Sequence, residues 1–221
     1  MRILITLFLA TLIPQSVFAE SESNIIKNVE TEFANMTTMS AKFKQTFFDA
    51  AMEESETTTG TMKIKKQLKM QWIYDPPEQQ IIISDGKNIY LYMPDEKQVI
   101  VEKIGNIINS SSPALFLAGG RALRDIFTIR LATDENKDRM VAGIRLELIP
   151  KQESISVTRI IVAVDAKNWR IRSFSIIDWA GNRTDVELFD IQVNKSLDDG
   201  LFTFKAPKGV EAVKLPNMKM E

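Results

Sequence analysis

The sequence predicts a mainly β protein built on one large antiparallel sheet, with helices covering one side of it. Apolar and polar residues alternate through most of the chain from Ala41 onward, and turn signals such as Asp85-Gly86 separate the alternating runs. Two segments, residues 24–37 and 112–125, have helical character instead. A sheet of the ten or eleven strands expected here curls into a barrel or splits, so the helices are left to cover its concave side.

The first nineteen residues predict a secretory signal peptide. Arg2 is followed by an apolar run over residues 3–13, and small or moderately small residues lead up to Ala19. The apolar run is shorter than the roughly 17 to 25 residues that a membrane-spanning helix needs. We therefore expect cleavage after Ala19, export across the inner membrane, and a single domain over residues 20–221.

Residues 24–37 are expected to form the first helix, with Ser23 as its N-cap. Its apolar positions are spaced by three and four residues, which places them in one stripe along the helix. These positions are Ile26, Val29, Phe33 and Met36. We expect this stripe to pack against the rest of the protein.

Strands are expected from residue 41 to residue 102, because the hydrophobic period changes to two. The polar stretch 53–59, which ends at Gly60, predicts a turn or flexible loop between the first two strands. The expected strands are residues 41–47, 61–67, 70–74, 80–84, 88–93 and 98–102.

Ser112-Pro113 has the pattern of an N-cap and a first helical position, and it opens a short helical stretch within 112–125. Residues 114–118 are apolar on every side, so another part of the protein must cover them. Strands then resume and continue to the end of the chain. They are expected near residues 127–132, 140–149, 157–164, 169–177 and 184–193, with a last extended segment at 202–204.

The composition excludes several functional classes. The chain of 221 residues has no Cys and no His, and its formal net charge is −1. The missing side chains exclude disulfides, Ser-His-Asp and Cys-His catalysis, and His-containing zinc sites. The charge balance gives no basic stripe for nucleic acid. Paired carboxylates such as Asp178 with Asp185 would suit a glycosidase, but exposed turn carboxylates are far commoner. We expect no enzyme activity, metal or cofactor.

The large inward residues of the early strands are the candidate binding residues. Alternation alone fits two interpretations, a packed core or the lining of a cavity. The ten Met residues favour a cavity only weakly, because Met adapts to varied ligands but also fills cores. The candidates are Phe43, Phe47, Met62, Ile64, Met70, Trp72, Leu91, Met93 and Val99.

Several short motifs, in their order and spacing, resemble the outer-membrane lipoprotein carrier family (LolA). They include Phe43-x-Gln45, the run from Lys63 to Lys66, and the tail Phe202-x-Phe204-x-x-Pro207. The longest run from Met70 to Pro77, Met-Gln-Trp-Ile-Tyr-Asp-Pro-Pro, is followed by Ile-Ser-Asp-Gly-Lys up to residue 87. The resemblance extends over essentially the whole chain after the expected signal peptide.

This resemblance implies an incomplete antiparallel β-barrel of about eleven strands, with short helices as a lid over an apolar cavity. It also implies a periplasmic chaperone, expected to be monomeric, that binds the acyl chains of lipoproteins. Such a carrier takes acylated lipoproteins from an inner-membrane ABC transporter (LolCDE-like) and delivers them to an outer-membrane acceptor (LolB-like). The alternative is a periplasmic lipid-sensing or regulatory binding module with the same half-barrel fold.

The resemblance also assigns roles to individual residues. Met70 and Trp72 match the apolar or aromatic pair that lines the family's cavity, and Lys66 stands where the family usually carries an Arg that hydrogen-bonds the lid backbone. Lys has three donors on a flexible stem rather than a planar fork, so a latch made by Lys66 would differ from one made by Arg. The alternative for Lys66 is a solvated charge at a strand edge. The lid itself would include Leu115, Phe116 and Leu117.

Overall fold

The computed structural model describes residues 21–77, 79–104, 122–133, 143–152 and 157–213. Its helices are α1 (Glu22–Asn35), α4 (Leu123–Ile126) and the 3-10 helix η2 (Asp199–Phe202). The strands are β1 (Thr38–Asp49), β2 (Glu54–Lys65), β3 (Lys69–Tyr74), β4 (Ile81–Asp85), β5 (Asn88–Met93), β6 (Gln98–Lys103), β7 (Phe127–Leu131), β8 (Ile144–Pro150), β9 (Arg159–Val164), β10 (Ile171–Ile177), β11 (Arg183–Val193) and β12 (Glu211–Val213).

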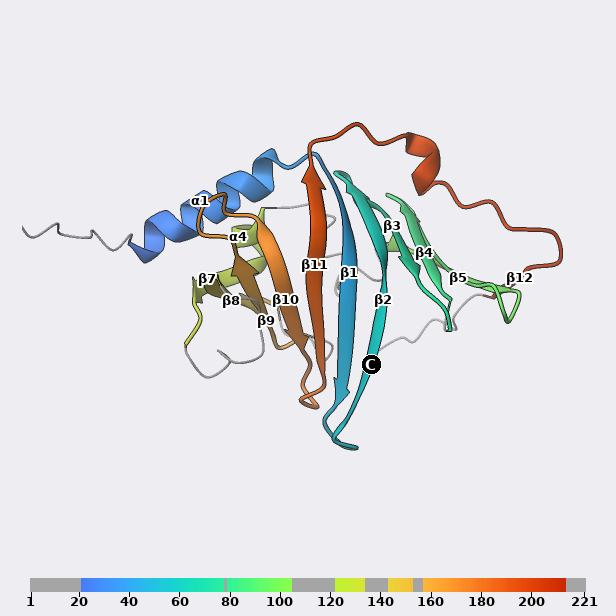
Figure 1. Cartoon of the computed structure of the whole chain (residues 1–221), viewed down its shortest axis with the longest axis horizontal. Helices are drawn as coiled ribbons and strands as arrows, with labels where there is room; N and C mark the ends of the chain where they lie inside the picture. The colour runs from blue at the N-terminus through green and yellow to red at the C-terminus, as the bar shows by residue number, and fades with distance from the viewer. Residues whose placement is uncertain (1–20, 78, 105–121, 134–142, 153–156, 214–221) are drawn as a thin grey trace, which may run out of the picture.

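The strands form one 12-stranded sheet in the order β12-β6-β5-β4-β3-β2-β1-β11-β10-β9-β8-β7. Figure 1 shows β1 and β11 in the middle of the sheet, with the two arms of the sheet curling away on either side. Strands β12 and β7 stay apart as edges, so the sheet is not closed into a barrel. The predicted mainly β, half-open antiparallel architecture is therefore confirmed.

The sheet differs from the sequence-based prediction at its end. Phe202, the first residue of the segment expected to be extended at 202–204, is the last residue of the 3-10 helix η2. The last strand is β12, which pairs in parallel with β6. Lys97 ends the tight turn before β6, and its carbonyl oxygen accepts a hydrogen bond from the backbone N–H of Glu211 at 2.9 Å. This short strand therefore joins the sheet through a partner that lies far away in sequence.

The polar stretch before Gly60 was wrongly predicted to be a loop, because it forms the first half of β2. Residues 54–59 pair in register with the second half of β1, for example Thr46 opposite Thr57, whose hydroxyl oxygens lie 3.0 Å apart. Thr has a high strand propensity, and both faces of this hairpin end are largely exposed. A strand exposed on both faces needs no hydrophobic alternation, so the pattern missed it.

The register divides the sheet into two faces. Trp72 of β3 lies opposite Met62 of β2 and Ile82 of β4, and these side chains point to the face that we call the inner face. Lys69 and Gln71 of β3 point to the opposite, outer face. The inner face carries the main hydrophobic core, which extends from β3 across the middle of the sheet to β8.

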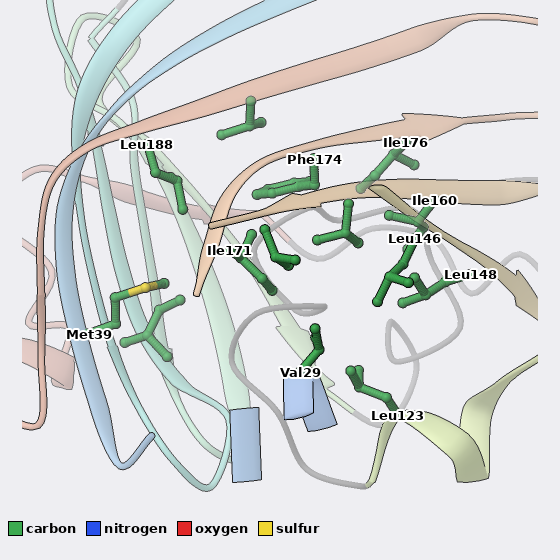
Figure 2. Close-up of a cluster of buried hydrophobic side chains, with 14 of the residues drawn as sticks. Val29, Met39, Leu123, Leu146, Leu148, Ile160, Ile171, Phe174, Ile176 and Leu188 are labelled. Carbon is green, nitrogen blue, oxygen red and sulfur yellow. The ribbon is translucent and has the colours of Figure 1, made fainter. Parts of the chain in front are cut away.

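Helix α1 covers the inner face on the β7–β10 arm. Its N-cap is Ser21, whose hydroxyl accepts a hydrogen bond from Asn24 N at 3.4 Å, so the predicted cap at Ser23 was two residues late. Ile25, Ile26 and Val29 are buried in the core. Figure 2 shows Val29 and Leu123 pointing toward the side chains of β8 to β11, which they cover.

The C-terminal segment, residues 195–213, crosses the outer face of the β2–β6 arm. Asp199 accepts hydrogen bonds from Lys65 at 3.0 Å and Lys69 at 2.9 Å, and Leu201 O accepts one from Gln71 Nε2 at 2.9 Å. Further on, the ring of Phe204 stacks on that of Tyr90, with centroids 5.2 Å apart. Ile83 and Val99 are buried on the same outer face, so the outer face is polar at β2 and β3 but apolar from β4 to β6.

Candidate functional site

Five of the nine candidate residues gather on the inner face of β1, β2 and β3. The strand register places Met62 opposite Trp72 and Ile64 opposite Met70, and Phe43 lies opposite Gly60 on the neighbouring pair. Each of the five side chains is almost completely buried. They form a continuous apolar surface whose members come from three consecutive strands.

An aromatic cluster forms the centre of this surface. The ring of Phe43 lies 4.7 Å from that of Trp72 and 5.1 Å from that of Tyr74, between ring centroids. Gly60 makes room for the Phe43 ring, because a Cβ at this position would stand 2.8 Å from Phe43 Cζ and 2.1 Å from the carbonyl oxygen of Ile73. The glycine thus fixes where the aromatic side chains pack.

The inner face continues onto β5 with less cover. Leu91 lies opposite Ile82 of β4, in line with Trp72 and Met62, and Met93 follows two residues later on the same face. Both Leu91 and Met93 are half-buried. The apolar surface therefore extends beyond the fully buried part, and its β5 end is accessible.

Val99 lies on the other face, which corrects its prediction as an inward residue. It stands opposite Tyr92 on β5, whereas the inward Leu91 stands opposite Ile100. Val99 is nevertheless only 1% exposed, and it lies outside the main core cluster. Both faces of β5 and β6 are apolar because the C-terminal segment covers the outer one. Alternation alone therefore could not tell which face was which.

Phe47 lies on the inner face of β1 but near the end of the β1–β2 hairpin. Its neighbours across the two strands are Thr184 and Glu56, and its side chain is 39% exposed. The inner face therefore changes along the strands, from buried apolar side chains near Ile64 to exposed and polar ones near Phe47.

Polar groups mark the transition between these two regions. The Tyr74 hydroxyl donates a hydrogen bond to Gln45 Oε1 at 3.2 Å, and burial raises the pKa of Tyr74 to about 12. The indole Nε1 of Trp72 is buried without a hydrogen-bond acceptor among the described residues. Neither Tyr74 nor Gln45 was among the predicted site residues. The alternation Met70, Trp72, Tyr74 and the Phe43-x-Gln45 motif place both on the same face and would have identified them.

Lys66, just after β2, contacts the end of helix α1. Its Nζ donates a hydrogen bond to the carbonyl oxygen of Ala34, in the last turn of the helix. A cation at a helix C-terminus also interacts favourably with the helix dipole. Its partner is the backbone of α1, whereas the resemblance implies a bond to the backbone of the lid. The predicted lid residues Leu115, Phe116 and Leu117 lie outside the described residues, as do residues 1–19.

Two ion pairs hold the outward side of α1. Glu30 pairs with Arg124 of α4 at 2.5 Å, and Glu32 pairs with Arg170 next to β10 at 2.8 Å. Under the helix, the described residues leave cavities of only about 10 Å³ and 20 Å³, each about the space of a water molecule. Helix α1 and the β7–β10 arm are therefore closely packed.

The carboxylates proposed as an alternative catalytic pair are engaged in local structure. Asp178 accepts hydrogen bonds from Asn182 N and Asn182 Nδ2, both at 2.9 Å. Asp185 accepts one from the Ser175 hydroxyl at 2.5 Å and pairs with Arg183 at 2.8 Å. Within the described ranges, no group of acidic side chains is arranged to hold a metal ion. No helix in the same ranges is long and apolar enough to cross a membrane.

Comparisons with known proteins agree with the resemblance in the sequence. Residues 34–205 match the family described as outer membrane lipoprotein carrier protein LolA. A protein named outer-membrane lipoprotein carrier protein from Pseudomonas paraeruginosa is 26% identical over 215 residues, which cover 96% of this chain and 99% of the relative. A protein of the same name from Nitrosomonas europaea is 29% identical over 214 residues, covering 96% and 98% of the two chains.

A solved structure supports the fold independently. An uncharacterized conserved protein from Thermus thermophilus superimposes with a TM-score of 0.51 at 14% sequence identity. The match covers 87% of this chain and 98% of that one.

Proposed function

The chain belongs to the outer membrane lipoprotein carrier protein (LolA) family, and from this premise we propose that it is a periplasmic carrier for lipoproteins. In this proposal it binds the acyl chains of a lipoprotein on the inner face of the sheet. It then carries them through an aqueous space between membranes. It works by binding and transport, without chemical conversion of its cargo.

The observation that carries this proposal is the continuous apolar inner face of β1, β2, β3 and β5. Its large side chains range from fully buried at Met70 to half-buried at Leu91. Each CH₂ group of an acyl chain costs about 0.8 kcal/mol when it is exposed to water, so a lipid anchor with several chains costs on the order of tens of kcal/mol. A carrier must offer apolar surface of this kind to make transfer through water feasible.

We propose that the cargo reaches and leaves this carrier at two membranes. An inner-membrane ABC transporter (LolCDE-like) would release the acylated lipoprotein to it, and an outer-membrane acceptor (LolB-like) would receive the lipoprotein. Export of the carrier itself would depend on residues 1–19 as a signal peptide cleaved after Ala19. The names of the relatives support a lipoprotein carrier, and the delivery steps are our proposal.

Loading requires the inner face to open, and helix α1 is suited to take part in this step. The helix is held by the apolar side chains Ile25, Ile26 and Val29, which are buried in the core. Polar contacts nearer the surface also hold it, among them Lys66 to the Ala34 carbonyl and Glu32 to Arg170. A ligand shifts a closed state to an open one only by its differential affinity for the two. In this proposal the acyl chains displace the helix because they replace its apolar contacts with the sheet, and the helix returns when they leave.

Photo-crosslinking in living cells tests the proposal. A photoreactive residue at Leu91, on the inner face, is expected to capture acylated lipoproteins. The matched position is Val99 on the next strand, which faces outward and is expected to capture none. Capture of lipoprotein at neither position, together with correct lipoprotein placement after depletion of the carrier, would contradict the proposal. Capture of other lipids only would favour a lipid-sensing module.

A further inference from the structure

We propose that the indole N–H of Trp72 donates a hydrogen bond to an ester carbonyl oxygen of the bound lipid anchor, at the junction between acyl chains and cargo. This inference rests on the proposed function, because it names the part of the ligand that the inner face recognises by polarity. Such a hydrogen bond would fix the position of the lipid anchor along the strands of the inner face.

The observation behind this inference is that the Trp72 indole N–H is buried and lacks a hydrogen-bond acceptor among the described residues. Trp72 is 1% exposed, and its Nε1 has no acceptor in the described part of the chain. A buried donor without an acceptor costs about 1–3 kcal/mol, and such groups are rare in native structures. A site that is completed by its ligand explains why this cost is retained.

The surroundings of Trp72 decide what kind of acceptor fits. Its neighbours across both adjacent strands, Met62 and Ile82, are apolar, and the ring of Phe43 packs against it. An anionic group placed here would be buried without a paired cation, which is far more costly than burial of a neutral acceptor. The carbonyl oxygen of an ester is neutral and can accept the hydrogen bond that the indole N–H offers. It therefore fits this position, whereas a phosphate or carboxylate does not.

The polarity gradient along the strands gives the direction of the ligand. On one side of Trp72 the inner face is buried and apolar, at Met70 and Ile64. On the other side lies the Tyr74–Gln45 hydrogen bond, followed by the exposed Phe47. With its carbonyl at Trp72, the anchor directs its acyl chains toward the Ile64 end and its peptide toward the Phe47 end.

Two lipopeptides that differ only at the junction test this inference. One carries two palmitoyl chains in ester linkage on a glyceryl-cysteine peptide, and the other carries two hexadecyl chains in ether linkage, which removes the carbonyl oxygens. The wild-type protein is expected to bind the ester about threefold to tenfold more tightly, the effect of one hydrogen bond. Its Trp72 indole N–H resonance is expected to shift downfield with the ester lipopeptide only.

Two variants identify the donor. Trp72→Phe removes the N–H and is expected to bring the ester-to-ether affinity ratio to about one, whatever its absolute affinity. Trp179→Phe changes the 71% exposed Trp of the β10–β11 turn and is expected to keep the wild-type ratio. With three Trp residues in the chain, the two variants also assign the indole resonances.

Each result has a distinct meaning. Equal binding of both lipopeptides by the wild-type protein, or an ester preference that survives in Trp72→Phe, overturns the inference and leaves the carrier function standing. Binding of neither lipopeptide overturns the proposed function itself. If Trp72→Phe does not fold, the two indole resonances that remain in Trp179→Phe decide. Shifts of both that are the same with the two lipopeptides exclude a bond to the carbonyl.

Discussion

Lys66 and Ala34 are joined by a hydrogen bond from the Lys66 ammonium group to the Ala34 carbonyl oxygen, which ties the end of β2 to the last turn of α1. The bond joins two elements that flank β1 in sequence. The backbone N–H of Lys66 also donates to Thr37 O at 2.9 Å, just after the helix. Lys66 therefore contacts the chain both at the end of the helix and at the start of the first strand.

We expect Lys66→Leu to loosen helix α1 and to alter lipoprotein transfer. Loss of the bond to the helix end removes about 1 kcal/mol, so amide hydrogen exchange in α1 should accelerate by about threefold to tenfold. Lys63→Leu, three residues earlier in β2, is the matched control, and it should leave exchange in α1 as in the wild-type protein. Unchanged exchange and transfer in Lys66→Leu would mean that Lys66 is a solvated charge.

The core under α1 should be the most sensitive to truncation. Phe174→Ala removes a fully buried ring on β10 and is expected to destabilise the protein by about 3–5 kcal/mol. Phe189→Ala truncates a ring that is 45% exposed and should change stability by less than about 1 kcal/mol. Denaturant unfolding curves of both variants measure this difference. Similar midpoints would show that Phe174 lies outside the stabilising core.

Alkaline titration should reveal the buried state of Tyr74. The pKa of its hydroxyl is raised from 10.0 to about 12 by burial, so the folded protein holds this proton where the unfolded chain has lost it. The stabilisation, about 2–3 kcal/mol, is therefore fully present below pH 10 and is lost as the pH rises toward 12. Absorbance of tyrosinate against pH, with Tyr74→Phe as the control, measures it. Titration of Tyr74 itself near pH 10 would contradict its burial.

Asp199 should hold the C-terminal segment on the outer face. Hydrogen bonds from Lys69 and Lys65 lower the pKa of its carboxyl group, so this contribution is present at neutral pH and is lost as the pH falls through the lowered pKa. Asp199→Asn is expected to accelerate amide exchange in β12, an effect that high salt in the wild-type protein should reproduce in part.

Asp190→Asn serves as the matched control, because it removes an exposed ion pair with Lys42 elsewhere on the sheet. It should leave exchange in β12 unchanged. Equal exchange in both variants would mean that the C-terminal segment is held without Asp199.

Much of the sheet could be predicted from the sequence, because its inner face is apolar and its turns carry strong local signals. Strand β4 ends at Asp85, and Gly86 opens the two-residue loop to β5 with a φ of +90°, which Gly adopts without strain. Alternation also placed Met70 and Trp72 on one face. These features depend on residues that are close in sequence, where local propensity and pattern agree.

The remaining features depend on partners that are distant in sequence. Val99 was assigned to the wrong face because the C-terminal segment makes the outer face of β6 apolar too. Strand β12 has only three residues and gains its structure from β6. Similarly, no local pattern shows that Lys66 reaches Ala34 or that Trp72 has no acceptor among the described residues. These relationships appear only when the strands and the helix are placed in space.

The pairing of β1 with β11 at the centre of the sheet has a consequence for how the protein folds. Thr38 Oγ1 donates a hydrogen bond to Lys195 O at 2.6 Å, across a separation of 157 residues. The middle of the sheet therefore pairs two segments that lie near opposite ends of the described chain. Contacts at such separation make folding slow. The hairpins of β1 to β6 can form early, but their apolar inner face stays exposed until β11 and the strands beside it have been made and have paired. During that interval the exposed apolar surface favours aggregation of the nascent protein.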